Sequence, residues 1–180
     1  EQPQGIVAII EPPRWELAHI AAGPRRPVLV LDGVQDPGNV GTMIRTALGL
    51  GAAGVVALKG TAELTSPKVI RGTMGALFRL PSVATDAGTF LAWAQARGIE
   101  VWAAAMDGEP IDRLTARDRP RPPATALVIG NEGAGVGAAI AGAADRRVAI
   151  PLAGPAESLN AAIAAGILLY EVTRERSPAP

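Results

Sequence analysis

The 180-residue chain contains no cysteine and a single histidine, His19. Without cysteine there can be no disulfide, no thiolate-ligated zinc site and no cysteine nucleophile. One histidine also excludes a multi-histidine metal site, so we expect a function that needs no metal. No apolar run reaches the eighteen or so residues that span a bilayer. We therefore expect no membrane partner and a cytoplasmic location.

Aromatic residues and net charge are also scarce. Aromatic side chains make up 3% of the chain and hydrophobic residues 48%, so the core must consist mainly of Ala, Val, Leu and Ile. Lys and Arg number 17, as do Asp and Glu, which gives a net charge of zero. A nucleic acid would have to be bound by a local basic patch, because the net charge provides no long-range attraction.

Apolar strands alternate with helices along the chain. Strands are predicted at residues 28–31, 55–58, 100–104, 126–130 and 147–150, and helices at 40–51, 66–78, 86–97, 136–144 and 158–176. An edge strand is predicted at 6–10 and a polar loop at 107–124. Nearly unbroken apolar strands between helices indicate an α/β fold with a mostly parallel sheet covered on both faces.

Three of the turns that follow strands carry glycine together with amide or carboxylate side chains. They are residues 36–39, residues 130–133, and the Pro/Gly loop 150–160. Because ligands bind at the carboxyl ends of parallel strands, we expect these loops to converge on a site. Ser158 is the predicted N-cap of the last helix, which is apolar on almost every side. Such a helix is buried within the fold or against a partner.

One glycine pattern permits a different function. Residues 133–138, Gly-Ala-Gly-Val-Gly-Ala, follow a strand and open a helix, close to the fingerprint of dinucleotide-binding oxidoreductases. The acidic residue expected at the end of the following strand is missing, since that strand ends in Ile150-Pro151-Leu152. A glycine-rich turn without a ligand is the simpler interpretation.

The three loops resemble the three motifs of the SpoU (TrmH-like) branch of the SPOUT RNA methyltransferases. The matching stretches are residues 36–47, residues 128–133, and residues 150–152 with 157–160 and the apolar helix behind them. Residues 66–71 and 75–81 resemble a further segment found in part of that branch. The resemblance covers residues 27–176 in the order and spacing of the family.

This resemblance implies S-adenosylmethionine as methyl donor and a ribose 2′-hydroxyl of RNA as acceptor. It also implies a C-terminal trefoil knot and a homodimer. Residues 71–81 resemble the members of the branch that act on ribosomal RNA, so ribosomal RNA is favoured over transfer RNA as the substrate. A transfer-RNA 2′-O-methyltransferase and a non-catalytic RNA-binding module of the same fold are the alternatives.

The resemblance assigns the catalytic residues Arg45, Asn39, Glu132, Ser158 and Asn160. Arg45 would orient or deprotonate the 2′-hydroxyl, although an arginine stays protonated and is better suited to gripping a phosphate or a developing alkoxide. Asn39 could equally be the N-cap of its helix. Glu132 would hold Arg45 or a hydroxyl group. Without the motifs, each would be an ordinary cap, turn or surface residue.

The resemblance also assigns residues to the cofactor and to RNA. The cofactor would contact Gly130, Asn131, Gly133, Ile150, Leu152 and Leu159. RNA phosphates would be bound by Arg45, Lys68, Arg71 and Arg79, although a charged helix face is more often only solvated.

Residues 1–26 read as a junction and residues 27–180 as the catalytic domain. The chain begins Glu-Gln-Pro-Gln, and residues 4–8 resemble the family's junction between an N-terminal substrate-binding domain and the knotted domain. We therefore expect an RNA-binding domain before the junction.

Overall fold

The computed structural model describes residues 11–115, 122–155 and 158–174. The edge strand predicted at 6–10 lies outside these ranges, as does part of the loop predicted at 107–124. Among the described residues, no helix is both long and apolar enough to cross a membrane.

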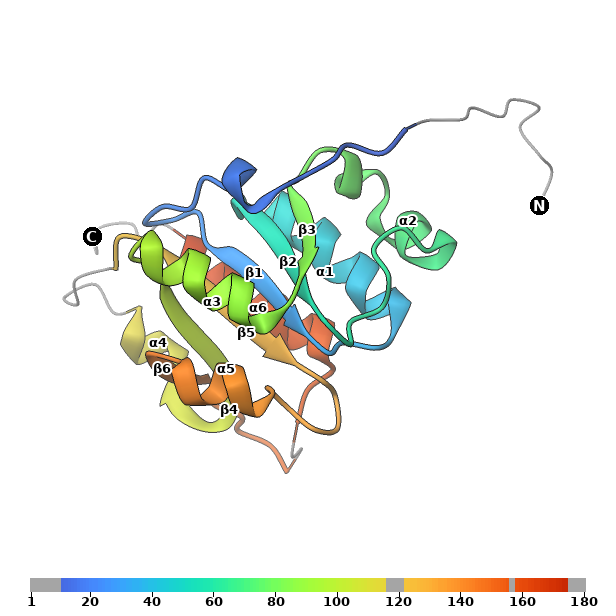
Figure 1. Cartoon of the computed structure of the whole chain (residues 1–180). Helices are drawn as coiled ribbons and strands as arrows, with labels where there is room; N and C mark the ends of the chain where they lie inside the picture. Colours follow the sequence, from blue (N-terminus) through green and yellow to red (C-terminus); the bar gives the residue numbers. More distant parts are fainter. Residues whose placement is uncertain (1–10, 116–121, 156–157, 175–180) are drawn as a thin grey trace, which may run out of the picture.

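A six-stranded sheet in the order β3-β2-β1-β5-β4-β6 forms the centre of the molecule, and every pairing is parallel (Figure 1). The strands are β1 (Val28–Asp32), β2 (Gly54–Leu58), β3 (Ser82–Thr85), β4 (Glu100–Pro110), β5 (Thr125–Gly130) and β6 (Arg146–Ala149). The predicted parallel α/β sheet is confirmed, and β3 is a strand that the sequence did not reveal.

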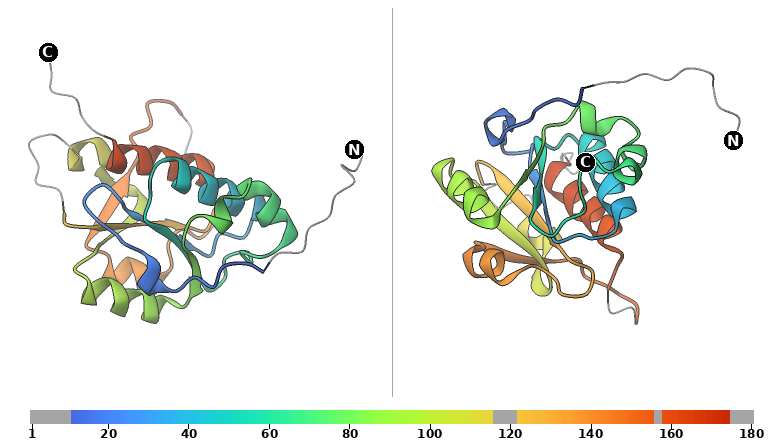
Figure 2. Two further views of the ribbon diagram at one scale, coloured as in Figure 1. Left: turned by 90° about the horizontal axis from the view of Figure 1, so that it is seen from above. Right: turned by 45° about the vertical axis from the view of Figure 1, so that its right-hand side comes forward.

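Helices cover both faces of the sheet, as predicted (Figure 2). One face carries α1 (Pro37–Gly49), α2 (Pro67–Thr73), α4 (Ile111–Leu114) and α6 (Ala161–Thr173), with the 3-10 turn η2 (Ala76–Phe78). The other carries α3 (Ala87–Ala96) and α5 (Ala138–Ala143), with η1 (Leu17–His19) near them. Alternate residues of a strand enter the two cores: Leu29 and Leu31 pack with α1 and α6, whereas Val28 and Val30 pack with α3.

Two helix starts differ from the prediction. Helix α1 begins at Pro37 because Asp36 is its N-cap and accepts a hydrogen bond from the Asn39 amide at 2.9 Å. Asn39 is therefore not the cap. Helix α6 begins at Ala161, and its cap is Asn160 rather than Ser158, since the Asn160 side chain accepts hydrogen bonds from two amides of the first turn. The predicted catalytic residues Asn39 and Asn160 therefore lie in the first turn of α1 and at the N-cap of α6, respectively.

Two further elements differ in length. Helix α2 ends at Thr73, short of the predicted residue 78, because Met74 and Gly75 have left-handed φ angles of 49° and 85°. A 3-10 turn, not the same helix, covers the remaining residues. Strand β4 continues to Pro110 through residues predicted as loop, because Glu109 and Pro110 pair with β6.

The segment before β1 packs on the domain. Ile20 is fully buried in the core beneath α3. The Trp15 indole donates a hydrogen bond to the Leu77 carbonyl at 3.4 Å. The role of residues 1–26 as a junction stays a prediction, as does the trefoil knot.

Candidate active site

A line of three side chains crosses the carboxyl edge of the sheet. The Asn160 Nδ2 donates to Asn39 Oδ1 at 3.1 Å, and Asn39 Nδ2 donates to Glu132 Oε1 at 2.8 Å. The three residues come from the start of α6, the first turn of α1 and the loop after β5. The convergence of the three loops that the sequence predicts is therefore present in the structure.

The backbone of α6 fixes the direction of this line. Asn160 Oδ1 accepts from the amides of Ala162 and Ile163 at 2.9 and 3.3 Å, so its Nδ2 must be the group that faces Asn39. Asn39 must then present Oδ1 to Asn160 and Nδ2 to Glu132. The donors of both asparagines consequently point along the line toward the Glu132 carboxylate.

The side chains of Asn131 and Asp32, which lie outside the Asn160–Asn39–Glu132 line, hold the loop bearing Glu132. The Asn131 amide donates to the Gly33 carbonyl at 3.0 Å, and its Oδ1 accepts from Gly133 N and Ala134 N at 2.9 and 3.0 Å. Asp32 Oδ2 accepts from the Gly137 amide at 2.7 Å, across 105 residues of sequence. The loop is thus fastened to the end of β1 at two points. Asp32 was missed because its only signal was its place at the end of a strand.

Gly130 allows the loop to fold back on β5. A Cβ atom at this position would lie 2.1 Å from the carbonyl carbon of Gly135. Asn131 and Gly135 are joined there by two backbone hydrogen bonds of 2.9 Å. Any larger residue at Gly130 would push this loop, and Glu132 with it, away from Asn39.

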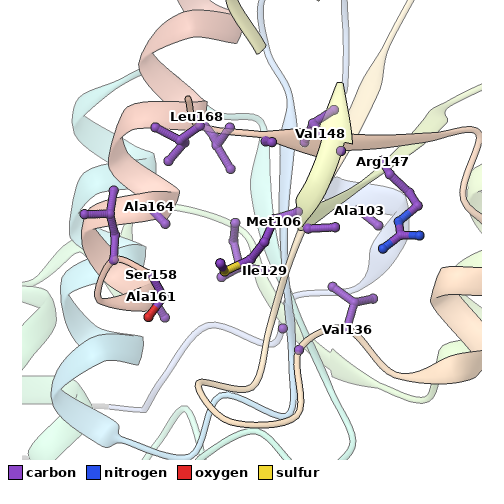
Figure 3. Close-up of a pocket in the computed structure, with 18 of the residues that line it drawn as sticks. Ala103, Met106, Ile129, Val136, Arg147, Val148, Ser158, Ala161, Ala164 and Leu168 are labelled. Atoms are coloured by element: carbon purple, nitrogen blue, oxygen red, sulfur yellow. The ribbon is translucent and has the colours of Figure 1, made fainter. Parts of the chain in front are cut away.

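A cavity of about 1050 Å³ opens beside the line, between α6 and the ends of β4, β5 and β6 (Figure 3). Its floor is apolar and includes Ile129, Val148 and Leu168. All six residues predicted to contact the cofactor line the cavity, namely Gly130, Asn131, Gly133, Ile150, Leu152 and Leu159. Glu132 and Ser158 line it as well. Asn39 adjoins the cavity through its hydrogen bond to Glu132, and Asn160 lies between the cavity residues Leu159 and Ala161.

Strands β4 and β6 contribute cavity residues that sequence reasoning missed. Met106, Asp107 and Arg147 all line the cavity, and Arg147 forms an ion pair with Asp107. Residues 107–110 were predicted as loop, so no signal placed them beside the motif residues.

Arg45 lies apart from the other predicted catalytic residues. It is exposed on α1, six residues beyond Asn39, which places it about 9 Å along the axis and about 120° away around the helix. It makes no hydrogen bond or ion pair with any residue in the described ranges. Within this chain the Glu132 carboxylate accepts a hydrogen bond from Asn39. The catalytic roles assigned to Glu132 and Arg45 stay predictions.

The family model of the SpoU rRNA Methylase family matches residues 26–170. The chain belongs to this family. The resemblance read from the three motifs is therefore confirmed.

Relatives of this SpoU family chain include two curated proteins. One is the "23S rRNA (guanosine(2553)-2'-O)-methyltransferase RlmP" of Bacillus subtilis, 40% identical over 96% of this chain and 66% of the relative. Another is the "23S rRNA (uridine(2479)-2'-O)-methyltransferase" of Streptomyces viridochromogenes, 37% identical over 98% of this chain and 62% of the relative. The chain thus spans slightly less than two thirds of these relatives.

A solved structure shows the same fold. The SpoU methyltransferase AviRb from Streptomyces viridochromogenes, in complex with AdoMet, superimposes with a TM-score of 0.80 at 34% identity. The superposition covers 89% of this chain and 62% of AviRb.

Three more cations of this SpoU family chain lie beside α1. Lys68 and Arg71 are exposed on α2, and Arg79 is exposed after η2, the two elements that pack against α1. None of the three forms an ion pair with a residue that the structure describes. They are therefore available to bind an anion.

The geometry argues against a dinucleotide in the glycine-rich turn. A dinucleotide would place its pyrophosphate at the N-terminus of α5. That position is occupied by the Asp32 carboxylate, which accepts from the Gly137 amide. Two negative groups would compete for the same amides, so the oxidoreductase alternative is wrong, in agreement with membership of the SpoU family.

Proposed function

We propose that this chain is the catalytic part of an S-adenosylmethionine-dependent methyltransferase that modifies a ribose 2′-hydroxyl of ribosomal RNA. The observation that carries the proposal is the line Asn160–Asn39–Glu132 beside a large cavity. The relatives named as 23S rRNA 2'-O-methyltransferases support the reaction and the substrate class.

The cavity suits the methyl donor. Its volume of about 1050 Å³ holds a nucleoside-sized ligand. The apolar floor can take a purine, and the backbone of the loops after β5 and β6 provides donors and acceptors. Gly130, Ile150 and Leu159 would contact the donor mainly through backbone groups and apolar packing. AviRb, whose fold this chain shares, was solved with AdoMet.

Bound S-adenosylmethionine supplies an electrophilic methyl group on a sulfonium. In the transfer the ribose oxygen would bond to this methyl group as the methyl–sulfur bond breaks and the thioether departs. The residues of this chain must therefore hold the ribose oxygen in line with the methyl group and provide an acceptor for the hydroxyl proton. Glu132 is exposed at the rim of the cavity, so its carboxylate can accept a hydrogen bond from the incoming hydroxyl. Asn39 holds the carboxylate in place from one side, and Ser158 provides a further hydroxyl on the cavity wall.

Arg45 acts on the RNA rather than on the donor. Its guanidinium is exposed and presents a planar set of donors, so it binds a phosphate next to the target ribose. Lys68, Arg71 and Arg79 extend the positive surface along α2 and η2. A local surface is needed because the net charge of the chain is zero.

A homodimer formed through α6 is part of the proposal. Ile163, Ile167 and Tyr170 are 56%, 38% and 52% exposed, and they follow one another at helical spacing. A stripe of large apolar side chains on a well-formed helix is typical of an interface. Gly166, on the same side of α6, is close to α1: a Cβ atom added at Gly166 would lie 3.6 Å from Cγ2 of Thr46. The interface would therefore border α1, the helix that carries Arg45.

We further propose that an RNA-binding domain precedes the junction at residues 1–26, in a cytoplasmic protein. The relatives that the chain matches are longer than the chain. The test compares this chain with the longer protein on one RNA at one salt concentration. Equal RNA affinity and equal methylation rate would contradict this part of the proposal.

The main test incubates the purified chain, and the longer protein, with labelled S-adenosylmethionine and total RNA, and then maps the modified ribose. We expect label in 23S rRNA at a 2′-oxygen. Label in transfer RNA only would support the alternative substrate, and donor binding without any transfer would support the non-catalytic RNA-binding module. Calorimetry with and without a chelator should give the same donor affinity, because the proposal needs no metal.

A further inference from the structure

Strand β4 contains an excursion at the rim of the cavity. Ala104 and Glu109 both pair with Val148 of β6, so the four residues between them leave the sheet. Gly108 brings the excursion back against β6 so closely that a Cβ atom there would lie 2.6 Å from the backbone of Val148. The excursion is therefore a short, closed strap with fixed ends, hereafter the 105–108 strap.

The tip of the strap carries a methionine that lacks apolar cover. Met106 is 68% exposed, although it lines the cavity and points into it from the side of β4 (Figure 3). An unbranched thioether side chain adapts readily to the shape of a ligand. Exposure of such a residue toward an open cavity indicates that a ligand completes its packing.

The strap is fastened to β6 by charge. Asp107, next to Met106, forms an ion pair with Arg147, whose side chain also lines the cavity. Both side chains remain largely exposed, at 69% and 57%. An exposed ion pair contributes little to stability, but it can open and close at little cost.

We propose that the 105–108 strap retains the bound methyl donor, with Met106 covering an apolar part of the donor and the Asp107–Arg147 pair holding the strap closed. The inference rests on the proposed function, because it assigns the cavity to S-adenosylmethionine. The weak pair makes the strap reversible, so that the spent donor can leave after each transfer. Asp107 and Arg147 are positioning residues in this scheme, and they act through Met106.

The chain offers a matched control for the ion pair. Arg146 is the neighbour of Arg147, and it pairs with Glu100 at 3.4 Å between the same two strands. That pair lies at the other end of β4 and does not line the cavity. If donor release depended only on the stability of the β4–β6 pairing, loss of either ion pair would change it. If it depends on the strap, only loss of the Asp107–Arg147 pair should change it.

The experiment measures the dissociation rate of S-adenosylmethionine by stopped flow. We expect Arg147→Gln and Asp107→Asn each to raise it by about 2- to 5-fold. Arg146→Gln should leave it at the wild-type value. The double exchange Arg147→Asp with Asp107→Arg should restore slow release. If the exchange does not restore slow release, Arg147 contacts the donor directly, and the proposal that the Asp107–Arg147 pair holds the strap closed is overturned.

Met106 is tested separately. Met106→Ala should weaken donor affinity by about 3- to 10-fold, and Met106→Leu should restore most of it. Unfolding temperatures equal to the wild type would exclude a folding defect. Wild-type affinity in Met106→Ala would overturn the strap, while failure of the wild type to bind the donor would instead overturn the proposed function.

Discussion

Asn39 and Glu132 are 93 residues apart in sequence, and the amide of the first donates to the carboxylate of the second at 2.8 Å. Asn39 is itself oriented by Asn160, which is oriented by the backbone of α6. The start of α6 is thus linked through two asparagine side chains to a carboxylate in the loop after β5. The relationship explains why a loop, a helix turn and a helix cap occur together as three motifs.

The first prediction concerns the charge of Glu132. Glu132→Gln retains a carbonyl oxygen that can accept from Asn39, so the line should remain, but the charge is lost. If the carboxylate receives the hydroxyl hydrogen bond, methyl transfer should slow by about 10²- to 10⁴-fold. Single-turnover kinetics with saturating donor would measure this, and calorimetry should show donor affinity within a few-fold of the wild type. A wild-type rate in Glu132→Gln would contradict the role given to Glu132.

The sequence predicted the sheet, both helix layers and the loops of the site, because each depends on local patterns. Strands of unbroken Val, Leu and Ile, such as residues 28–31, can only be buried between two layers. Strand β3 was missed because Ser82–Thr85 is only 4 residues long, lacks a regular alternation of polar and apolar residues, and follows a proline.

The helix caps were harder to predict, since several polar residues compete at each start. Asp36 and Asn39 are both good caps, and so are Ser158 and Asn160. Only the three-dimensional structure shows that Asn39 and Asn160 are also hydrogen-bonded to each other. The break after α2 depends on a left-handed φ of 49° at Met74, which is unusual for a methionine and is not encoded by local propensity.

The strap and its ion pair had no sequence signal. Asp107 and Arg147 are 40 residues apart, and they meet only because β4 and β6 are neighbours at the edge of the sheet. Asp32 likewise meets Gly137 only through the pairing of β1 with β5. Contacts of this kind follow from topology, which no local pattern specifies.

The second prediction separates RNA contacts from donor contacts. Arg45→Ala should reduce methylation by at least about 10²-fold while donor affinity stays within a few-fold, because Arg45 lies away from the cavity. Arg97 on the opposite face, beyond the end of α3, is a matched control, and Arg97→Ala should retain full turnover. Methylation assays on ribosomal RNA with calorimetry of donor binding would test both. Substantial turnover by Arg45→Ala would contradict its assignment to the acceptor.

The third prediction concerns the wall of the cavity. Leu159 is half-buried between the loop after β6 and the start of α6. Leu159→Arg places a charge and a long side chain in the space proposed for the donor, so donor binding should be lost in calorimetry. An unfolding temperature close to the wild type would show that the fold is intact. Retained binding would show that the donor lies elsewhere.

The fourth prediction tests the dimer. Ile163→Glu places a charge in the exposed apolar stripe of α6 and should convert a dimer into a monomer, because an interface excludes unpaired charge. Ala92→Glu, at an exposed position of α3 on the other face, is the control. Light scattering at micromolar concentration would measure both masses. A wild-type chain that is a stable monomer under these conditions would contradict the dimer.

The last prediction uses two aspartate caps that differ in their distance from the site. Asp36 caps α1, and the pKa of its carboxyl is lowered, mainly by the hydrogen bond from the Asn39 amide; burial opposes the shift, and Gly38 and Lys68 add to it. Asp86 caps α3, and its pKa is lowered mainly by the side-chain and backbone hydrogen bonds of Thr89. A lowered pKa in the folded state means that the stabilisation is complete above the pKa of the unfolded chain and is lost as the pH falls through the folded value.

Substitution of the two caps should therefore have the same effect on stability and different effects on activity. Asp36→Asn and Asp86→Asn should both lower the unfolding temperature at pH 7, and the difference from wild type should shrink as the pH falls below about 4. Only Asp36→Ala should also slow methyl transfer, because the amide that it releases belongs to Asn39, which positions Glu132. Asp86→Ala should keep the wild-type rate at temperatures where it is folded. Calorimetry across pH measures the first effect, and single-turnover kinetics at pH 7 the second. Equal rates for the two alanine variants would show that the start of α1 does not control the position of Glu132.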